Sequence, residues 1–489
     1  MQAQEVVRNL QQKGYLISPE ALKAILTSEN PEELAALAME NAKDNLTISL
    51  EDLKSRERTK PIEEKAEVRV DYTAFKPISK DIESQVKLHK NSDNKTSGTL
   101  EDFVGYFRSR YEQLHEVLKM RAGNDVVKIA DLKKKAGEKV RLIAMISEKR
   151  RSKNGHILMT LEDLTGTATA LVPASNANLI SSAGSLVLDE VIAVDGRRSK
   201  ELFIVDAIFE PDLPLKEVKT IEEDIMIAAL SDFHIGSKLF MQKNFENFIA
   251  WINGDFGDEK LRELASKVKY ITIAGDLVDG IGIYPGQEEE LNLTDIYEQY
   301  EAFSDYIKQI PDYIHVIISP GNHDAVKAAD PQPPIPKELL PDLYGMSNVT
   351  MVPSPAMVQI HGLKTLIYHG TSLDDIIAAV PSLNYDQIDK VMIETLRKRH
   401  LHPIYGEKPI TPEARDHLVI NEIPDIFHAG HIHKNAYERY RGVICVNSGA
   451  WQEVTPYQVK LGHRPTPCIL PLISMKGGKI NVVRFDKAI

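Results

Sequence analysis

The chain has 489 residues, and its 71 Asp and Glu against 59 Lys and Arg give a formal net charge of −12. This length favours two or three domains over one core, and the acidic balance excludes a basic footprint spread over the whole chain, so nucleic-acid contact must come from local patches or from a partner. No run approaches the roughly 20 apolar residues that cross a bilayer, no signal peptide is visible, and two cysteines exclude a disulfide scaffold, so we expect a cytoplasmic protein without membrane contact.

Residues 1–50 alternate helical periodicity with breaks, which predicts a small helical module. The sequence Ser-Pro-Glu at 18–20 is typical of a capped helix with Pro in its first turn, and Asn-Pro-Glu at 30–32 begins a second helix. A module this small holds no large core, so its expected uses are docking to a partner or packing on the body. Residues 51–99 are charged and poor in apolar side chains, which predicts a polar linker.

Residues 100–215 are expected to combine an amphipathic helix with a small barrel. Apolar side chains recur at helical spacing from Leu100 to Arg121. Strand-like patterns follow at residues 139–146, 157–162, 167–172, 191–195 and 202–209. Five short strands in roughly 85 residues predict a Greek-key barrel of the OB type that binds nucleic acid.

Two turns of the predicted barrel carry clustered positive charge. The first basic cluster is Lys149, Arg150, Arg151 and Lys153, and the second basic cluster is Arg197, Arg198 and Lys200. Barrels of this type bind single strands through a basic groove and aromatic stacking. Aromatic side chains are sparse in this part of the sequence, and Phe203 is the main candidate for stacking. DNA contact and ordinary solvated hairpin tips therefore both remain open for these residues.

From residue 216 to the end, strand-like and helical patterns alternate, and a polar motif follows each of five short apolar runs. The runs cover residues 225–230, 270–274, 314–318, 363–367 and 423–427. The motifs are Ser231-Asp232-Phe233-His234, Gly275-Asp276-Leu277-Val278-Asp279, Gly321-Asn322-His323-Asp324, Tyr368-His369-Gly370 and Gly430-His431-Ile432-His433. Because ligands collect at the carboxyl ends of strands in open α/β sheets, we expect these motifs to meet.

The motifs offer carboxylate, amide and imidazole donors and no thiolate. This mixture suits Mn²⁺, Fe²⁺ or Zn²⁺, with Mg²⁺ a further candidate. In extended backbone, the spacing of Asp232 and His234 places both side chains on one side and Phe233 on the other. Asp276 is placed to bridge two ions, as in two-metal sites that act on phosphoryl groups. Asp279 is predicted to support a ligand or to cap the next helix.

As a set, these motifs resemble those of the calcineurin-like metallophosphoesterases, a superfamily that includes nucleases. The resemblance covers Asp232 to His433 and implies an α/β fold, with a phosphoesterase β-sandwich flanked by helices in residues 216–489. It implies two divalent ions, with Mn²⁺ as the first choice. One ion would be held by Asp232, His234, Asp276 and His433, and the second by Asp276, Asn322, His369 and His431. It also implies that His323, oriented by Asp324, contacts the phosphate and protonates the leaving oxygen.

The order of the parts resembles the small subunits of archaeal family D DNA polymerases over nearly the whole chain. Residues 102–111, 447–452 and 465–467 carry this likeness in addition to the motifs. The resemblance implies a 3′→5′ exodeoxyribonuclease that proofreads for a separate large catalytic subunit. Its substrate would be single-stranded 3′ ends of DNA, and the sliding clamp is a further candidate partner.

Two other classes of function stay open. One is a non-catalytic assembly subunit that uses the phosphoesterase fold as a scaffold. The other is a small-molecule phosphodiesterase, which explains neither the barrel nor the N-terminal module. The presence of all seven expected ligands favours the nuclease. The remaining histidines considered are expected to be surface or structural residues: His361, His400, His402, His417, His428 and His463.

Overall fold

The structure is a computed structural model that describes residues 16–28, 31–42, 47–48, 75–89, 96–123, 125–460 and 462–486, with residues 6, 10, 13 and 53. Its contacts divide the chain into two units, Met1–Thr73 and Ala74–Ile489, which we describe separately. None of the helices in these described ranges is long and apolar enough to cross a membrane.

The N-terminal unit is a small helical module with its own apolar cluster. Its elements are β1 (Leu16–Ile17), α2 (Pro19–Leu26), α3 (Pro31–Ala42) and β2 (Thr47–Ile48), and β1 pairs with β2 in parallel. Ser18 caps α2 by accepting a hydrogen bond from the N–H of Ala21, and Pro19 occupies the first turn. Both helix starts predicted from the sequence are confirmed.

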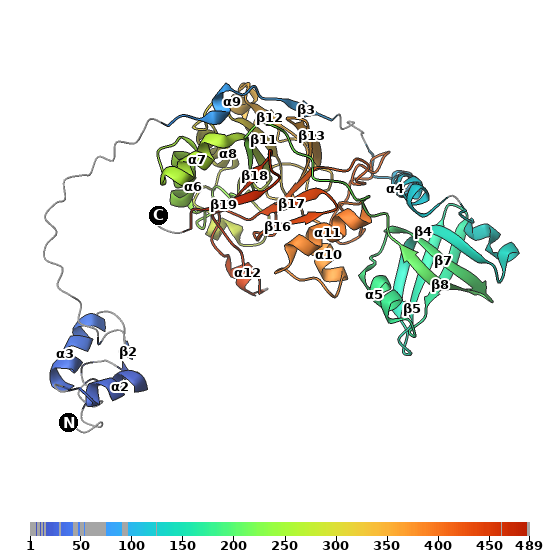
Figure 1. Cartoon of the computed structure of the whole chain (residues 1–489), viewed down its shortest axis with the longest axis horizontal. Helices are drawn as coiled ribbons and strands as arrows, with labels where there is room; N and C mark the ends of the chain where they lie inside the picture. The colour runs from blue at the N-terminus through green and yellow to red at the C-terminus, as the bar shows by residue number, and fades with distance from the viewer. Residues whose placement is uncertain are drawn as a thin grey trace. The chain divides into compact units, whose positions relative to one another are not determined.

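The larger unit is built around two six-stranded sheets that pack face to face (Figure 1). The first sheet has the order β12-β11-β10-β9-β18-β19, and the second has the order β16-β17-β15-β14-β13-β3. The strands of the first sheet are β9 (Met226–Leu230), β10 (Val268–Ala274), β11 (His315–Ser319), β12 (Val349–Met351), β18 (Ile469–Ser474) and β19 (Ile480–Arg484). Those of the second are β3 (Val86–Leu88), β13 (Ala356–Ile360), β14 (Leu363–Tyr368), β15 (Ile426–Ala429), β16 (Asn435–Tyr440) and β17 (Val443–Ser448).

Helices cover the outer face of each sheet, so the order of layers is α/β/β/α. Side chains from one face of the first sheet pack with α6 (Gln242–Ile252), α7 (Glu259–Lys267), α8 (Ile296–Ile307) and α9 (Pro341–Tyr344). Those of the second pack with α10 (Leu373–Ala379) and α11 (Ile388–Lys398). A third apolar cluster fills the space between the sheets. Two short elements, η4 (Gln287–Glu290) and α12 (Pro456–Lys460), lie in loops.

A closed five-stranded barrel precedes this sandwich. Its order is β4-β5-β6-β8-β7, and a helix, α5 (Ala177–Ser185), lies between its third and fourth strands in the sequence. The strands are β4 (Lys139–Arg151), β5 (Ile157–Asp163), β6 (Gly166–Val172), β7 (Val191–Ser199) and β8 (Leu202–Phe209). All five predicted strands are therefore found, and the short helix η3 (Ile129–Lys135) packs on the same apolar core.

The helix α4 (Leu100–Ala122) contacts both the barrel and the sandwich. Leu114 and Leu118 pack against β4 and β7 of the barrel. On another face of the helix, the Arg110 guanidinium donates from Nε to Asp416 over 2.8 Å, and Tyr106 donates to the same carboxylate over 2.9 Å. The predicted amphipathic helix is confirmed, and a buried charged contact anchors it to the sandwich.

Part of the segment that was expected to be a polar linker belongs to the sandwich. Residues 75–89 include η2 (Ile78–Asp81) and β3, and β3 pairs antiparallel with β13 at the edge of the second sheet. The burial pattern explains the difference, because β3 is short and two of its three side chains are exposed. An edge strand needs little apolar sequence, so composition alone did not indicate it.

Candidate metal centre

Five strands deliver the five polar motifs to one end of the sandwich. Strands β9 and β10 of the first sheet end directly before the motifs of Asp232 and Asp276, and Pro320 alone separates β11 from the motif of Asn322. Strands β14 and β15 of the second sheet end before those of His369 and His431. Four of the predicted runs match observed strands within two residues at each end, and the fifth, 423–427, overlaps β15 only at residues 426–427. The site lies at the carboxyl ends of strands from both sheets.

Five of the residues in these motifs other than Gly have left-handed backbone. Positive φ angles occur at Asp232, His234, Asp276, His431 and His433. The extended backbone predicted for the first motif is therefore wrong, since both Asp232 and His234 have φ of 53°. The predicted division of side chains still holds, because Phe233 is buried and packs edge-on against Phe245.

Two glycines let the chain segments approach closely around the site. A Cβ on Gly321 would lie 2.2 Å from Oδ1 of Asp276, and one on Gly275 would lie 2.6 Å from Nδ1 of His369. Any side chain at either position would therefore displace a predicted metal ligand.

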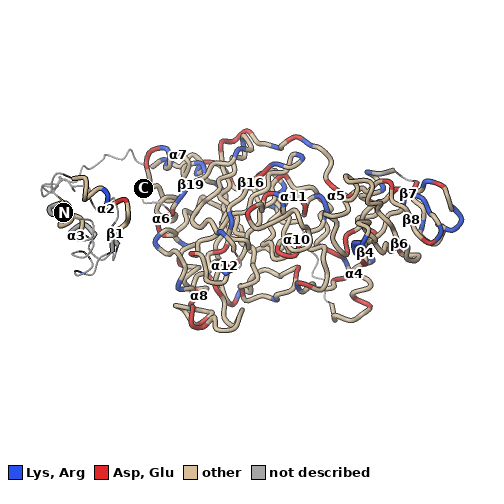
Figure 2. Tube along the Cα trace, turned by 90° about the horizontal axis from the view of Figure 1, so that it is seen from below, with Lys and Arg blue, Asp and Glu red and all other residues tan. Residues whose placement is uncertain are grey.

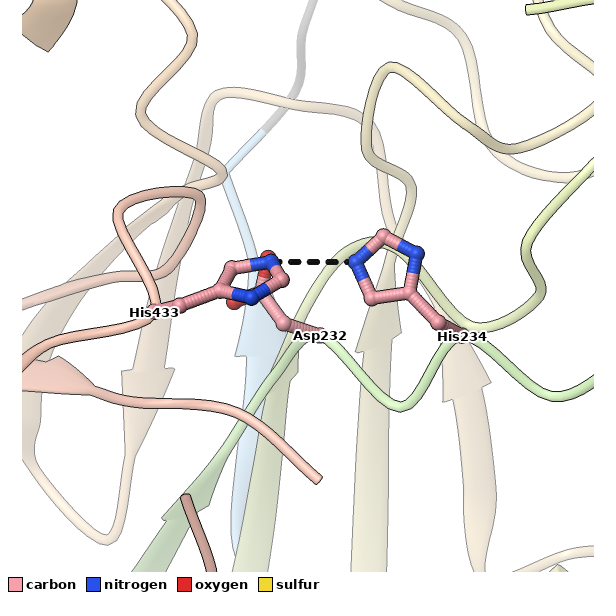
Figure 3. Close-up of side chains that lie close together, drawn as sticks. All are labelled: Asp232, His234 and His433. Atoms are coloured by element: carbon pink, nitrogen blue, oxygen red, sulfur yellow. Dashed lines mark hydrogen bonds and ion pairs between the residues drawn. The ribbon is translucent and has the colours of Figure 1, made fainter. Parts of the chain in front are cut away.

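Asp232, His234 and His433 form the first group of donors (Figure 3). The Nε2 atoms of His234 and His433 are 3.1 Å apart, and Oδ1 of Asp232 lies 3.4 Å from Nε2 of His433. All three side chains are buried. The donor atoms converge from two loops, and this is the arrangement that one cation would hold together.

Asp276, His369 and His431 form the second group. Nε2 of His369 lies 2.9 Å from Oδ1 of Asn322 and 3.3 Å from Oδ2 of Asp276. The backbone N–H of His323 donates to the other oxygen of Asp276, Oδ1. Oδ2 is also 3.7 Å from Nε2 of His234 in the first group. Asp276 therefore presents one oxygen to both groups, as a bridging carboxylate does.

Each of the four imidazoles has a partner on the nitrogen that points away from the site. Nδ1 of His234 lies 3.1 Å from Asp279, and Nδ1 of His369 donates to the carbonyl of Ala274 over 2.7 Å. The Gln458 amide lies 2.9 Å from Nδ1 of His433, and Oδ2 of Asp374 lies 3.0 Å from Nε2 of His431. Such contacts fix ring orientation. At His234, His369 and His431 the partner is an acceptor, so the opposite nitrogen keeps its lone pair for a metal ion. At His433 the Gln458 amide N–H donates to Nδ1, so this contact orients the ring only.

The electrostatics of the site favour a cation between these groups. Burial alone would raise the pKa of Asp276, but His369 and His323 hold it well below the ordinary value. Burial would lower the pKa of His369, but Asp276 and Asp232 raise it to about 10. Buried carboxylates that are ionised require compensating positive charge, which the protonated His369 supplies in the chain alone. The carboxylate, amide and imidazole donors fit a divalent ion, which would replace that proton on binding.

His323 lies beside the two groups of donors, but its hydrogen-bond partner differs from the predicted one, Asp324. Its Nδ1 donates to the backbone carbonyl of Asp279 over 2.8 Å, and its ring packs edge-on against His234. Asp324 instead accepts from the N–H of Gly321 over 2.8 Å and from the Tyr300 hydroxyl over 3.1 Å. The prediction that Asp324 orients His323 is therefore wrong, because the buried Asp324 carboxylate braces the turn that carries them both.

Several residues at the rim of the site had no signal in the sequence. Asp374 lies on α10, and Gln458 lies on α12. The ring of His463 stacks on Tyr385 with centroids 3.8 Å apart, and the Tyr385 hydroxyl donates to Asp374. Burial lowers the pKa of His463, and so do the charges of His433 and His431. His463 thus lies at the rim of the site, where its stacking on Tyr385 agrees with the expected structural role.

Four other histidines have structural partners, as predicted. His400 bonds to Asp416, His402 to Asp330, His428 to Thr272 and Ser448, and His361 to Tyr270. His417 is half-buried and lies 3.7 Å from Glu413.

The two basic clusters lie at opposite ends of one strand. Arg197 pairs with Lys139 at the start of β4, whereas Arg151 at its end pairs with Ile157. Twelve residues of extended chain span roughly 40 Å, so the clusters do not form one patch. Figure 2 shows positive charge around the hairpin of β7 and β8.

Three of the residues considered for DNA contact in the barrel, two basic and one aromatic, are engaged in internal contacts or buried. Lys149 donates from Nζ to the carbonyls of Gly184 and Leu186, and burial lowers its pKa. Arg198 donates to the carbonyl of Lys200. Phe203, the aromatic candidate, is buried in the barrel core. The side chains of Arg150, Arg151, Lys153, Arg197 and Lys200 are exposed.

Comparison with known proteins gives consistent matches along the chain. The family model for the B-subunits of DNA polymerases alpha and epsilon matches residues 227–437, a range that includes all seven predicted ligands. The DNA polymerase II small subunit of Methanothermobacter thermautotrophicus is 38% identical over 99% of this chain and 100% of its own length. That of Methanocaldococcus jannaschii is 42% identical over 85% of this chain and 71% of its own length. That of Archaeoglobus fulgidus is 43% identical over 82% of this chain and 80% of its own length.

The chain belongs to the small subunits of archaeal DNA polymerase II, the family D polymerase. The resemblance to these small subunits, stated from the order of the parts, is thereby confirmed. Because the M. thermautotrophicus small subunit matches from end to end, the membership covers the helical N-terminal unit and the barrel as well as the sandwich.

Proposed function

We propose that this small subunit is a metal-dependent 3′→5′ exodeoxyribonuclease that removes nucleotides from single-stranded 3′ ends. The observation that carries the proposal is the convergence of all seven donors, with an outer partner on every imidazole. A scaffold has no need to keep ionised carboxylates buried in left-handed backbone, because both features cost stability. The direction of degradation follows from the family resemblance.

Asp232, His234, Asp276 and His433 would hold one ion, and Asp276, Asn322, His369 and His431 would hold the other. When bound, two such ions, with Mn²⁺ as the first choice, activate water and neutralise the charge of the phosphodiester. The chain itself contributes the rigid positions of the donors. The partners Asp279, Ala274, Gln458 and Asp374 limit how far each imidazole can turn.

His323 is the residue suited to act on the leaving group. Its Nδ1 is engaged with the Asp279 carbonyl, so Nε2 is the nitrogen left to face a substrate. The side chain is half-buried, which leaves it accessible from solvent, unlike Asp324. In its protonated form it would contact the phosphate and give its Nε2 proton to the departing sugar oxygen, a step of general acid catalysis.

The same proposal assigns the partners. The names of the related proteins describe small subunits of a polymerase, so we expect this chain to assemble with a large catalytic subunit. DNA would be the second partner, and the sliding clamp is a further candidate. In this assembly the exonuclease would proofread the strand that the large subunit extends.

The decisive experiment is a time course of degradation of a single-stranded oligonucleotide labelled at its 5′ end, with Mn²⁺ and with EDTA. A 3′→5′ exonuclease produces a descending ladder with Mn²⁺ only, whereas cleavage from the 5′ end releases the label at once. Bound metal is measured in parallel. Two bound ions without DNA cleavage would favour the scaffold role, and hydrolysis of a small phosphodiester alone would favour the phosphodiesterase.

A further inference from the structure

The short helix α12 is connected to the metal centre through one side chain. Thr455 and Gln458 bond reciprocally, since each backbone N–H donates to the side chain of the other residue. This pattern resembles a capping box and fixes the Gln458 side chain. The fixed Gln458 amide then contacts His433, a predicted ligand. The position of α12 is therefore tied to that of the site.

A second chain of contacts joins the end of this segment to the other histidine of the same motif. The N–H of His463 donates to the carbonyl of Gln458 over 2.9 Å. His463 stacks on Tyr385, the Tyr385 hydroxyl donates to Asp374, and Asp374 contacts His431. Residues 455–460, residues 462–463 and the loop that carries Tyr385 consequently form a rim that is held on both His431 and His433.

Tyr457 projects from this rim into solvent. Its side chain is 69% exposed, although it directly precedes Gln458. Tyr457 and Gln458 are adjacent on α12, so the ring is carried by the same helical turn that contacts His433. A large aromatic ring in solvent has no role in the packing of a five-residue helix, and it remains free to stack on a ligand.

Basic side chains follow Tyr457 in the sequence, and the exposed Glu453 is the acidic residue nearest to it in the sequence. Lys460 on the same helix and Arg464 just beyond it are exposed. Lys434 follows the His431–His433 motif and pairs with Asp386 over 3.0 Å. Aromatic rings interleaved with cations are the surface on which proteins bind single-stranded nucleic acid, because bases stack on the rings and phosphates lie near the cations.

We propose that Tyr457 is a stacking platform for an unpaired base of the strand whose 3′ end occupies the metal centre. This proposal rests on the proposed nuclease function and names a binding subsite for its substrate. The ring would hold the terminal nucleotides in position without reading their sequence, since every base offers a π-face. A base in a duplex is stacked and paired already, so the subsite would also favour a frayed end over a paired one.

The test compares the full chain with Tyr457→Ala, Tyr457→Trp and the matched variant Val459→Ala. Val459 is 64% exposed on the same helix and has no ring. Two substrates are used: oligo(dT), and the same oligonucleotide with tetrahydrofuran residues, which keep the phosphates but lack bases, at its last three positions. DNA affinity is measured by fluorescence anisotropy in the presence of Ca²⁺. Cleavage is measured in the presence of Mn²⁺, and the metal content of each protein is measured by elemental analysis.

Base stacking is worth about 1–3 kcal/mol, so Tyr457→Ala should weaken oligo(dT) binding and raise KM by roughly 5- to 150-fold. The same variant should bind the tetrahydrofuran substrate as the parent chain does. Tyr457→Trp should retain affinity, and Val459→Ala should match the parent. Metal content should be equal in all four proteins.

Three results would overturn the platform. Tyr457→Ala with unchanged affinity removes any role for the ring, and equal losses on both substrates exclude base stacking. A loss of metal in Tyr457→Ala would show that the ring supports α12 and His433 instead. These outcomes differ from failure of the nuclease proposal, in which the parent chain binds oligo(dT) but does not cleave it with Mn²⁺.

Discussion

Five residues at the metal centre adopt a conformation that L-amino acids avoid. Each residue other than Gly in the left-handed region costs on the order of 1–3 kcal/mol when the surroundings impose it. At Asp232 and His431 the strain is compensated locally, because the His431 N–H donates to both oxygens of Asp232. The two motifs thus stabilise each other across the sheets, and the donors are held in place before any ion binds.

The separate roles of His323 and His431 lead to different expected losses. General acid catalysis contributes about 10²–10⁴-fold, so His323→Ala should lose rate on that scale and keep both ions. His431→Ala should lose an ion, because it removes a predicted ligand of the second site. Single-turnover cleavage and metal analysis of both variants check this. If His323→Ala loses metal as His431→Ala does, His323 is a ligand and the leaving-group role is wrong.

Asp374 should act on metal binding through His431. Asp374→Asn keeps the shape but weakens the carboxylate contact with Nε2 of His431. Outer partners of metal ligands typically contribute 10- to 100-fold in metal affinity or activity, so we expect a loss of that size for the second ion. Calorimetric titration with Mn²⁺ measures it. Asp305→Asn, at an exposed ion pair on α8, is the matched control, and equal affinities in both variants would contradict the role.

At the scale of elements, α4 is held by a buried ion pair. Arg110 and Asp416 are both fully buried, and Arg110 also donates to the carbonyl of Pro403. Removing one partner of a buried pair leaves an uncompensated charge and costs about 3–5 kcal/mol. Arg110→Met should therefore weaken the docking of α4 by about this amount, visible as faster hydrogen exchange of its amides. The exposed Arg108 on the same helix provides the control, Arg108→Met, which should exchange like the parent.

The same contact should depend on pH in a defined direction. Burial lowers the pKa of His400 to about 4, and burial alone would raise that of Asp416, but His400 and Arg110 hold it well below its ordinary value. Both folded pKa values lie below those of the unfolded chain, about 6.5 for His and 3.9 for Asp. The stabilisation that His400 and Asp416 give to the docked α4 is therefore complete above pH 6.5, and it falls as the pH drops from 6.5 through 4.

Exchange of α4 amides should accordingly speed up below pH 6.5 after correction for the intrinsic rate. His400→Gln should flatten the upper part of this dependence, since it removes the group that titrates there. A parent protein whose docking is constant from pH 7 to pH 4.5 would contradict this assignment.

The sequence was sufficient for the strands that carry the site but not for the backbone beyond them. Five apolar runs predicted five strands because buried strands need continuous apolar sequence, as in β10. The left-handed turns at Asp232 and Asp276 were not predicted, since these residues rarely adopt them and only tertiary contacts impose them. The partner of His323 was misassigned for a related reason: a neighbour in sequence was chosen, whereas the actual acceptor is a carbonyl on another loop.

At the scale of the whole molecule, the acidic chain would repel DNA except where positive charge is concentrated. The exposed members of the two basic clusters lie at opposite ends of β4, and the rim around Tyr457 lies at the metal centre. Loops at the two ends of a five-stranded barrel can flank one bound strand. Each cluster would then contact a different stretch of DNA and contribute independently to its affinity.

Salt dependence can measure these contributions one at a time. On single strands, log K falls by about 0.7 per phosphate contact for each decade of salt. Replacing Arg150, Arg151 and Lys153 by Gln should reduce the slope by up to about 2, and replacing Arg197 and Lys200 should reduce it by up to about 1.4. When both sets of substitutions are combined in one variant, the two reductions in slope should add, because the clusters are too far apart to share a phosphate. Gln at the exposed Lys243 and Lys260 of α6 and α7 is the control for net charge alone. A slope that the cluster variants share with this control would assign both hairpin tips to ordinary solvated surface.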